Sequence, residues 1–202
     1  MTVLLECIFS GVKKIAQSKS SQKLCAFRIY TLESFTFISF IVKLEINIQT
    51  KSVINMQNIL ITGANRGIGL GFVKKFLKRN SKVFCTSRKI SKSKELILLK
   101  KEFSKNLEIV ELDLLEEESP KILSDFLSNQ AIDIFINNAG VIGNSNQSFN
   151  AVSSENWIDV LKVNLIAPLL ITQSILENIK KSAHKKIYFL SSKVGSIEDN
   201  SM

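Results

Sequence analysis

Apolar and polar positions alternate in two distinct ways between residues 56 and 190. Short apolar runs bounded by polar residues are typical of buried strands, whereas apolar residues that recur every three or four positions are typical of helices. Strands that alternate with helices form a parallel sheet with helices on both faces, so we expect an α/β fold. The pattern predicts strands at 58–62, 82–86, 107–112, 132–136 and 186–190, and helices at 68–79, 92–103, 117–128 and 154–181.

Residues 1–55 do not follow this pattern. They show no clear period, no proline and a single glycine, Gly11. Their first thirty residues hold five lysines and arginines against one acid, Glu6, a balance that resembles a transit peptide. We predict that residues 1–55 are an N-terminal leader or extension outside the fold, and that residues 56–202 form the domain with Met56 as functional start. A transit peptide and an accessory segment are the alternatives.

The net charge of +9 would suit a nucleic-acid partner. However, the lysines sit in separate pairs without an aromatic or glycine-rich RNA-binding motif, so we expect no nucleic acid to bind. No apolar run approaches the roughly 18 residues that cross a bilayer, so we expect no membrane span. The three cysteines lack metal-ligand spacing and favour a reducing compartment, which predicts a cytoplasmic protein without a metal site.

The segment TGANRGIG joins the first predicted strand to the first helix. Its glycines, Gly63, Gly67 and Gly69, follow the pattern G-x-x-x-G-x-G. A backbone without Cβ atoms can approach a pyrophosphate closely, and the helix N-terminus offers that anion free N–H groups. The position between strand and helix predicts a dinucleotide site, with a tight turn that binds no ligand as the alternative.

The end of the second strand distinguishes the two nicotinamide cofactors. An acid at this position binds the ribose 2′-hydroxyl of NAD and repels a 2′-phosphate. Here the sequence reads VFCTSRK, with Ser87 in the place of the acid, followed by Arg88 and Lys89. Arg66 in the glycine loop adds another cation, so the sequence favours NADP(H) over NAD(H). The alternative is that Arg88 is only a surface cation.

Further motifs occur in a fixed order along the chain: NNAG after the fourth strand, VNLIAP in the long helix, and FLSS at the end of the fifth strand. Together with TGANRGIG, they make the region from about Met56 to Met202 resemble the short-chain dehydrogenase/reductase family. The ending SSKVGSIEDN resembles the branch with C-factor and sniffer-type carbonyl reductases. The resemblance implies a Rossmann-type doubly wound sheet, incomplete, with strand order 3-2-1-4-5. It also implies hydride transfer between NADP(H) and a small carbonyl or alcohol substrate.

The resemblance assigns roles to the matching residues. Ser192 would hydrogen-bond the substrate carbonyl, and Asn164 would hold a water in a proton relay. Pro168 lies four residues after Asn164 and has no N–H, so the Asn164 carbonyl lacks its helical partner and can hold that water. A simple helix kink is the alternative. The implied cofactor contacts are Gly63, Asn65, Arg66, Gly67, Ile68 and Gly69 at the phosphates and ribose, Asp113 and Leu114 beside the adenine, and Asn138, Ala139 and Gly140 along the floor.

One expected group is missing from the 202 residues. The family's general acid is a tyrosine in Y-x-x-x-K, placed shortly after the serine, and its lysine lowers the pKa of the phenol. The chain has only Tyr30 and Tyr188, and neither is followed four residues later by lysine. We therefore expect a truncated, inactive form of an oxidoreductase, for which a family-like homo-oligomer is doubtful. A non-enzymatic NADP(H)-binding sensor or scaffold and a basic nucleic-acid-binding protein are the alternatives.

Overall fold

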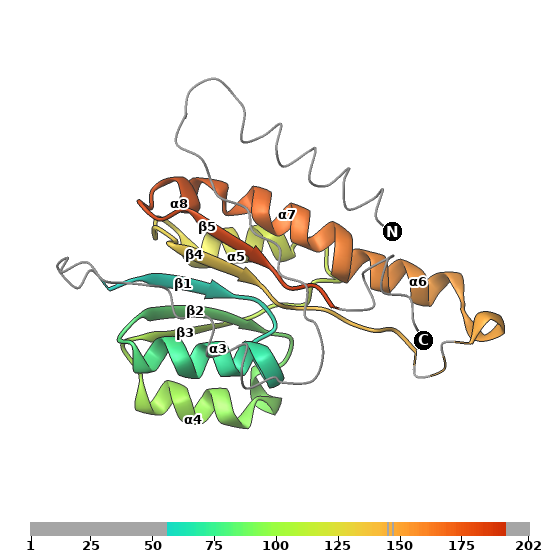
Figure 1. Ribbon diagram of the computed structural model, residues 1–202, viewed down its shortest axis with the longest axis horizontal. Helices are drawn as coiled ribbons and strands as arrows, with labels where there is room; N and C mark the ends of the chain where they lie inside the picture. Colours follow the sequence, from blue (N-terminus) through green and yellow to red (C-terminus); the bar gives the residue numbers. More distant parts are fainter. Residues whose placement is uncertain (1–55, 145, 147, 193–202) are drawn as a thin grey trace, which may run out of the picture.

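The computed structural model describes residues 56–144, 146 and 148–192. The predictions for residues 1–55 and for the chain after Ser192 lie outside these residues. The described part forms a five-stranded parallel sheet of order β3-β2-β1-β4-β5, which confirms the predicted fold class and strand order (Figure 1). The strands are β1 (Asn58–Ile61), β2 (Lys82–Ser87), β3 (Leu107–Glu111), β4 (Ile134–Asn137) and β5 (Lys186–Phe189).

Helices cover both faces of the sheet. Helices α3 and α4 lie on one face, while α5 and α7 lie on the other, so the sheet is enclosed between two helical layers (Figure 1). The helices and helical turns are α3 (Gly67–Lys78), η1 (Ile90–Lys92), α4 (Lys94–Glu102), α5 (Ser119–Leu127), η2 (Phe149–Ala151), α6 (Ser154–Leu161), η3 (Lys162–Ile166), α7 (Ala167–Ser174) and α8 (Leu176–Lys180).

Two apolar clusters, one on each side of the sheet, form the core. Because side chains alternate along a strand, β1 sends Ile59 and Ile61 into the cluster that contains α3, and Leu60 into the opposite cluster. All three side chains are fully buried. Strands buried on both faces are expected of a parallel sheet covered by helices on each side. The nearly continuous apolar runs of the sequence are therefore explained by burial on two sides.

The long helix predicted for residues 154–181 is interrupted in the structure. Residues Lys162–Ile166 form a π-helical turn in which the N–H of Ala167 bonds to the carbonyl of Lys162, five residues earlier. The interruption falls just before Pro168, which cannot donate a hydrogen bond to the carbonyl of Asn164. A second break occurs at Ile175, between α7 and α8. The prediction of one continuous helix was wrong at both points. At the first, the wider turn accommodates the missing N–H of the proline.

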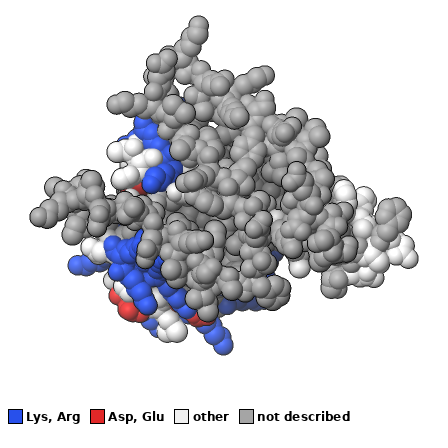
Figure 2. Space-filling model, in the orientation of Figure 1, with Lys and Arg blue, Asp and Glu red and all other residues white. Residues whose placement is uncertain are grey.

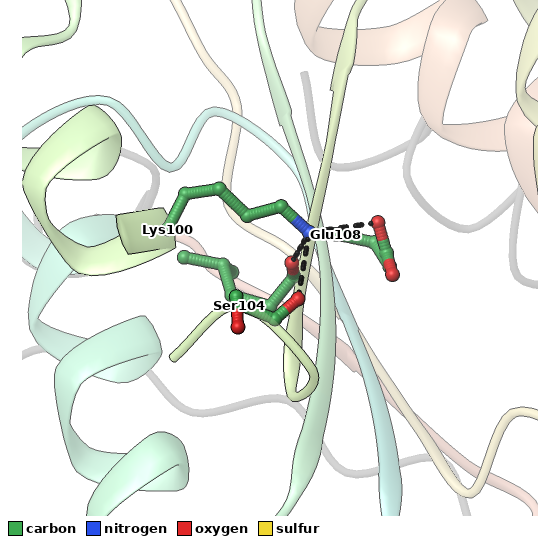
Figure 3. A network of polar contacts seen from close by, with 4 residues as sticks. Lys100, Ser104 and Glu108 are labelled. Atoms are coloured by element: carbon green, nitrogen blue, oxygen red, sulfur yellow. Dashed lines mark hydrogen bonds and ion pairs between the residues drawn. The ribbon is translucent and has the colours of Figure 1, made fainter. Parts of the chain in front are cut away.

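Lys100 fastens the end of α4 to the start of β3 (Figure 3). Its ammonium group donates hydrogen bonds to the carbonyl oxygens of Ser104, at 3.0 Å, and Leu107, and it forms an ion pair with Glu108 at 3.1 Å. Burial raises the pKa of the Cys85 thiol on β2 to about 12, and the positive charge of Lys100 partly offsets this shift. Cys85 is therefore a protonated core side chain at neutral pH.

Charge is distributed unevenly over the domain. Residues 66–105 hold thirteen lysines and arginines against two acids, whereas residues 106–192 hold six against eleven. Figure 2 shows Lys and Arg side chains gathered in the lower part of the view, where Figure 1 places α3 and α4. Such a surface attracts anions to the half of the domain that carries the glycine loop. Among the described residues, no helix combines the length and apolar content that crossing a membrane requires.

Candidate dinucleotide-binding site

The glycine loop connects β1 to α3 in a shape that side chains would disturb. Gly63 has a positive φ of 64°, and a Cβ there would lie 2.8 Å from the Cα of Ala139. Gly67 also has a positive φ, 56°, but nothing lies within 4 Å of its Cβ position. Gly63 therefore allows the loop to pack against the end of β4, while Gly67 leaves open space on the outer side of the loop. A Cβ on Gly69 would lie 2.5 Å from the carbonyl oxygen of Gly63.

Helix α3 begins at Gly67, beside this open space. No side chain caps it among the described residues, and its first turn contains no acid. The first N–H groups of a helix have no partner within the helix, and they carry the positive end of the helix dipole. The start of α3 can therefore bind an anion through backbone N–H groups. Asn65 and Arg66 are exposed beside it, and Ile68 packs its side chain against the core.

Thr62 and Asn138 hold the glycine loop against the end of β4. The side-chain amide of Asn138 donates to the carbonyl oxygens of Thr62 and Gly63, both at 2.9 Å. The Thr62 hydroxyl accepts hydrogen bonds from the backbone N–H groups of Asn138 and Ala139, both at 3.1 Å. The amide of Asn138 thus bonds to the loop backbone and supports the loop, while its role at the cofactor floor stays a prediction.

Thr86 on β2 holds the other side of the loop. Its hydroxyl accepts a hydrogen bond from the N–H of Gly63 at 3.2 Å, and its carbonyl oxygen accepts one from Ala64 at 2.9 Å. The sequence analysis did not identify Thr62 or Thr86. The available signal was a threonine near the end of each of the predicted strands 58–62 and 82–86.

The predicted 2′-phosphate region follows β2. Arg88 and Lys89 are exposed, as is Arg66 on the glycine loop. Ser87, in contrast, is only 2% exposed, and its hydroxyl lies 2.8 Å from that of Ser93. The region therefore presents three cations to solvent from two neighbouring loops, while the serine between strand and cations points into the protein.

The predicted adenine-side residues follow β3. Asp113 is partly buried, and its carboxylate accepts a hydrogen bond from the N–H of Leu115 at 3.1 Å, which closes a local turn. Leu114 is 9% exposed and packs into the core cluster on the α5 side. The structure brings Asp113 to the same edge of the sheet as Arg88, because β2 and β3 are parallel neighbours that end there.

Asn164 lies next to the NNAG segment. Its side-chain oxygen accepts a hydrogen bond from the N–H of Val141 at 2.9 Å, and its side-chain nitrogen donates to the Val141 carbonyl at 2.7 Å. A Cβ on the exposed Gly140 would lie 3.4 Å from the same side-chain oxygen. The π turn thus places the Asn164 side chain against the backbone that follows β4, beside the predicted floor residues.

Ser192 lies beyond β5, at the edge of the sheet where the glycine loop also lies, because all five strands are parallel. Its side chain is exposed, and no hydrogen bond joins it to Asn164 in the described part of the chain. Tyr188 lies within β5 and packs its ring against the core cluster on the α3 side. The described residues contain no group of three or more His, Cys, Asp or Glu side chains that could hold a metal ion.

The parallel sheet, the glycine loop and the uncapped helix start define a doubly wound dinucleotide-binding domain. A family model described as short chain dehydrogenase matches residues 57–202. The chain therefore belongs to the short-chain dehydrogenase family, as its motifs predicted. Members of this family are oxidoreductases, and the present chain shares their fold.

Individual relatives agree with this assignment. The chain is 33% identical to the 3-oxoacyl-[acyl-carrier-protein] reductase FabG of Aquifex aeolicus over 139 residues, which are 67% of this chain and 55% of that protein. A carbonyl reductase of Pseudomonas aeruginosa PAO1, solved in complex with NADP, superposes with a TM-score of 0.64 at 30% identity, covering 71% of this chain and 64% of that one. The carbonyl reductase Sniffer of D. melanogaster gives 0.65 at 34% identity, covering 72% and 65%. The chain thus spans about half to two thirds of the length of these relatives.

Proposed function

We propose that the domain binds NADP(H) at the start of α3 and serves as the cofactor-binding part of an oxidoreductase for small carbonyl or alcohol substrates. The observation that carries the proposal is the open space at Gly67, the first residue of the uncapped helix α3. This arrangement leaves room for a pyrophosphate and offers it backbone N–H groups. A family relative in complex with NADP supports the same ligand. When bound, the nicotinamide would supply or accept the hydride.

Each predicted contact residue has a proposed part in this site. Arg66 and Arg88, with Lys89 beside the latter, would bind the 2′-phosphate, and Asp113 would border the adenine. Asn138 would act indirectly, since its amide holds the carbonyls of Thr62 and Gly63 in place. The remaining proposed contacts are Gly63, Asn65, Gly67, Ile68 and Gly69 around the phosphates and ribose, Leu114 behind the adenine, and Ala139 and Gly140 along the floor.

The preference for NADP(H) follows from charge. Arg66, Arg88 and Lys89 are exposed, and the position after β2 that would carry an acid in an NAD site carries Ser87. A charge-assisted hydrogen bond to a phosphate contributes about 1.5–3 kcal/mol, which corresponds to a preference of roughly tenfold or more.

The substrate would bind near Ser192 and Asn164. Ser192 can polarise a carbonyl, and the carbonyl oxygen of Asn164 can hold a water, but neither group is acidic enough to protonate the product alkoxide. The 202 residues contain no Y-x-x-x-K, so we expect little turnover from this polypeptide tested as such. We further propose that the protein works in the cytoplasm without a nucleic-acid partner, and that residues 1–55 lie outside the fold.

Equilibrium titration tests the cofactor proposal. The 202-residue chain should enhance the fluorescence of bound NADPH saturably and bind it at least about tenfold more tightly than NADH. Replacement of the exposed Arg88 by serine should reduce the preference, whereas Lys121→Ser, an exposed cation on α5, should leave it unchanged. Equal affinity for the two cofactors would refute the NADP(H) assignment.

A non-enzymatic sensor or scaffold is the second candidate, because the chain has a cofactor loop without Y-x-x-x-K. A sensor must bind tightly enough to follow the cellular cofactor concentration. Sub-micromolar NADPH affinity with no carbonyl reduction would favour the sensor, while weak binding would favour an incomplete enzyme.

A further inference from the structure

Arg88 and Lys89 stand between two buried serines. Ser87 ends β2 and is 2% exposed, and Ser93, six residues later, directly precedes α4 and is 3% exposed. Buried hydroxyl groups need hydrogen-bond partners, so these two positions constrain the turn between them. The cations themselves are exposed at the outer side of this turn.

The number of hydroxyl protons determines which of the two serines donates to the other. A serine hydroxyl has one proton to donate. The Ser93 hydroxyl donates it to the backbone carbonyl of Lys89, at 2.9 Å. The 2.8 Å contact between the two hydroxyls therefore has Ser87 as donor and Ser93 as acceptor. Ser87 then has no proton left for a phosphate or ribose oxygen.

A second bond holds the turn from the side of β3. The carboxylate of Glu111 accepts a hydrogen bond from the N–H of Ile90 at 2.8 Å, and the N–H of Ser93 bonds to the carbonyl of Ile90 at 2.8 Å. The backbone from Lys89 to Ser93 is thus fixed at Lys89 by the serine pair and at Ile90 by Glu111. Arg88 and Lys89 therefore lie on a turn whose backbone is fixed by hydrogen bonds to Ser93 and Glu111.

We propose that Ser93 is a positioning residue for NADP(H) selectivity, acting through the chain Ser87–Ser93–Lys89 carbonyl that holds the 2′-phosphate turn. This inference rests on the NADP(H) proposal above and extends it to a residue with no ligand contact of its own. Ser87, which the sequence placed in the 2′-phosphate region, would then support the turn through its hydroxyl and would not contact the cofactor. Loss of the Ser93 hydroxyl should release the Lys89 carbonyl and let the two cations move away from a bound phosphate.

The test compares affinities for NADPH and NADH in the full 202-residue chain carrying Ser93→Ala. NADPH affinity should fall roughly three- to tenfold, because part of a charge-assisted contact is lost, while NADH affinity should change less than about twofold. Ser93→Thr, which keeps the hydroxyl, should retain the preference. Ser91→Ala, an exposed serine in the same turn, should behave as the unmodified chain.

The outcomes separate this proposal from the one on which it rests. An equal loss of affinity for both cofactors, or an NADPH preference that survives Ser93→Ala, would overturn the role of Ser93 alone. An unmodified chain without any preference would overturn both proposals. If Ser93→Ala does not fold, Ser93→Cys and Ser87→Ala replace it, and each should lower the preference in the same direction by a smaller factor. An unchanged preference in both would contradict the proposal.

Discussion

The glycine loop and the proposed substrate end, at Asn164 and Ser192, are held by different numbers of hydrogen bonds. At the glycine loop, Thr62 at the end of β1, Thr86 on β2 and Asn138 after β4 fix the backbone through six hydrogen bonds of 2.9–3.2 Å. At the proposed substrate end, the exposed side chain of Asn164 hydrogen-bonds to the backbone of Val141, and Ser192 is exposed beyond β5.

Under the proposed function, binding a cofactor and completing the reaction have separate structural requirements. The loop geometry depends on β1, β2, β4 and α3, all of which the described domain contains. Proton transfer to the substrate depends on an acid of suitable pKa, and neither Ser192 nor Asn164 is one. We therefore expect changes at the two ends to affect different measurements.

The largest effect should come from supplying a proton donor. A chain extended by a family-like segment with Y-x-x-x-K should oxidise NADPH with small aldehydes and ketones about 10²–10⁴-fold faster than the 202-residue chain, because a positioned general acid contributes that factor. The assay compares both proteins at saturating NADPH. Comparable turnover by the two would show that the 202 residues already contain a proton donor.

Gly63→Val should disrupt the cofactor end most strongly. The new Cβ would lie 2.8 Å from the Ala139 Cα, and valine disfavours a φ of 64°, so we expect a loss of about 2–5 kcal/mol in the free energy of unfolding. NADPH binding should be lost with it. Gly71→Ala is the matched control, because nothing lies within 4 Å of its Cβ position and alanine favours the helix. Urea unfolding of both variants measures the difference.

Thr62→Val should destabilise the glycine loop without adding a larger side chain. The substitution keeps the shape of the side chain but leaves the N–H groups of Asn138 and Ala139 without their acceptor. We expect a loss of about 1–3 kcal/mol in unfolding free energy and weaker NADPH binding. Thr172→Val is the control, a buried threonine on α7 whose hydroxyl donates to the Pro168 carbonyl. It should reduce stability without lowering the NADPH affinity of the folded fraction.

Cys85 should make stability fall with rising pH. Its pKa is about 12 in the folded domain against 9.0 for the unperturbed thiol, so the folded state holds the proton more tightly. Tighter binding of this proton contributes fully to the free energy of unfolding below pH 9. That contribution declines by up to about 1.4 kcal/mol per pH unit as the pH rises from 9 towards 12. Cys85→Ala lacks this slope. The difference between its urea midpoints and those of the parent should shrink between pH 8.5 and 10.5, and a constant difference would contradict the burial of the thiol.

The sequence predicted the sheet, its order and the glycine loop because these depend on periodicity and on glycines at fixed spacing. Pro168 predicted that the Asn164 carbonyl lacks its helical partner, but not that the helix forms a π turn there, because the contact of Asn164 with Val141 is revealed only by the assembled fold. Thr62 and Thr86 went unrecognised for a similar reason. Each is an ordinary strand-end hydroxyl whose partner is revealed only when neighbouring strands are assembled.

Hydrogen–deuterium exchange with and without NADPH tests the contrast between the two ends most directly. Saturating NADPH should slow exchange of the amides at 63–70, where the glycine loop meets the uncapped start of α3. Exchange at Ser154–Leu161 of α6 and at Ser192 should stay unchanged, since Ser192 lies at the proposed substrate end and α6 leads into the π turn that carries Asn164. Protection confined to α6 and Ser192, or no protection of 63–70 at saturating NADPH, would contradict the proposal that NADP(H) binds at the start of α3.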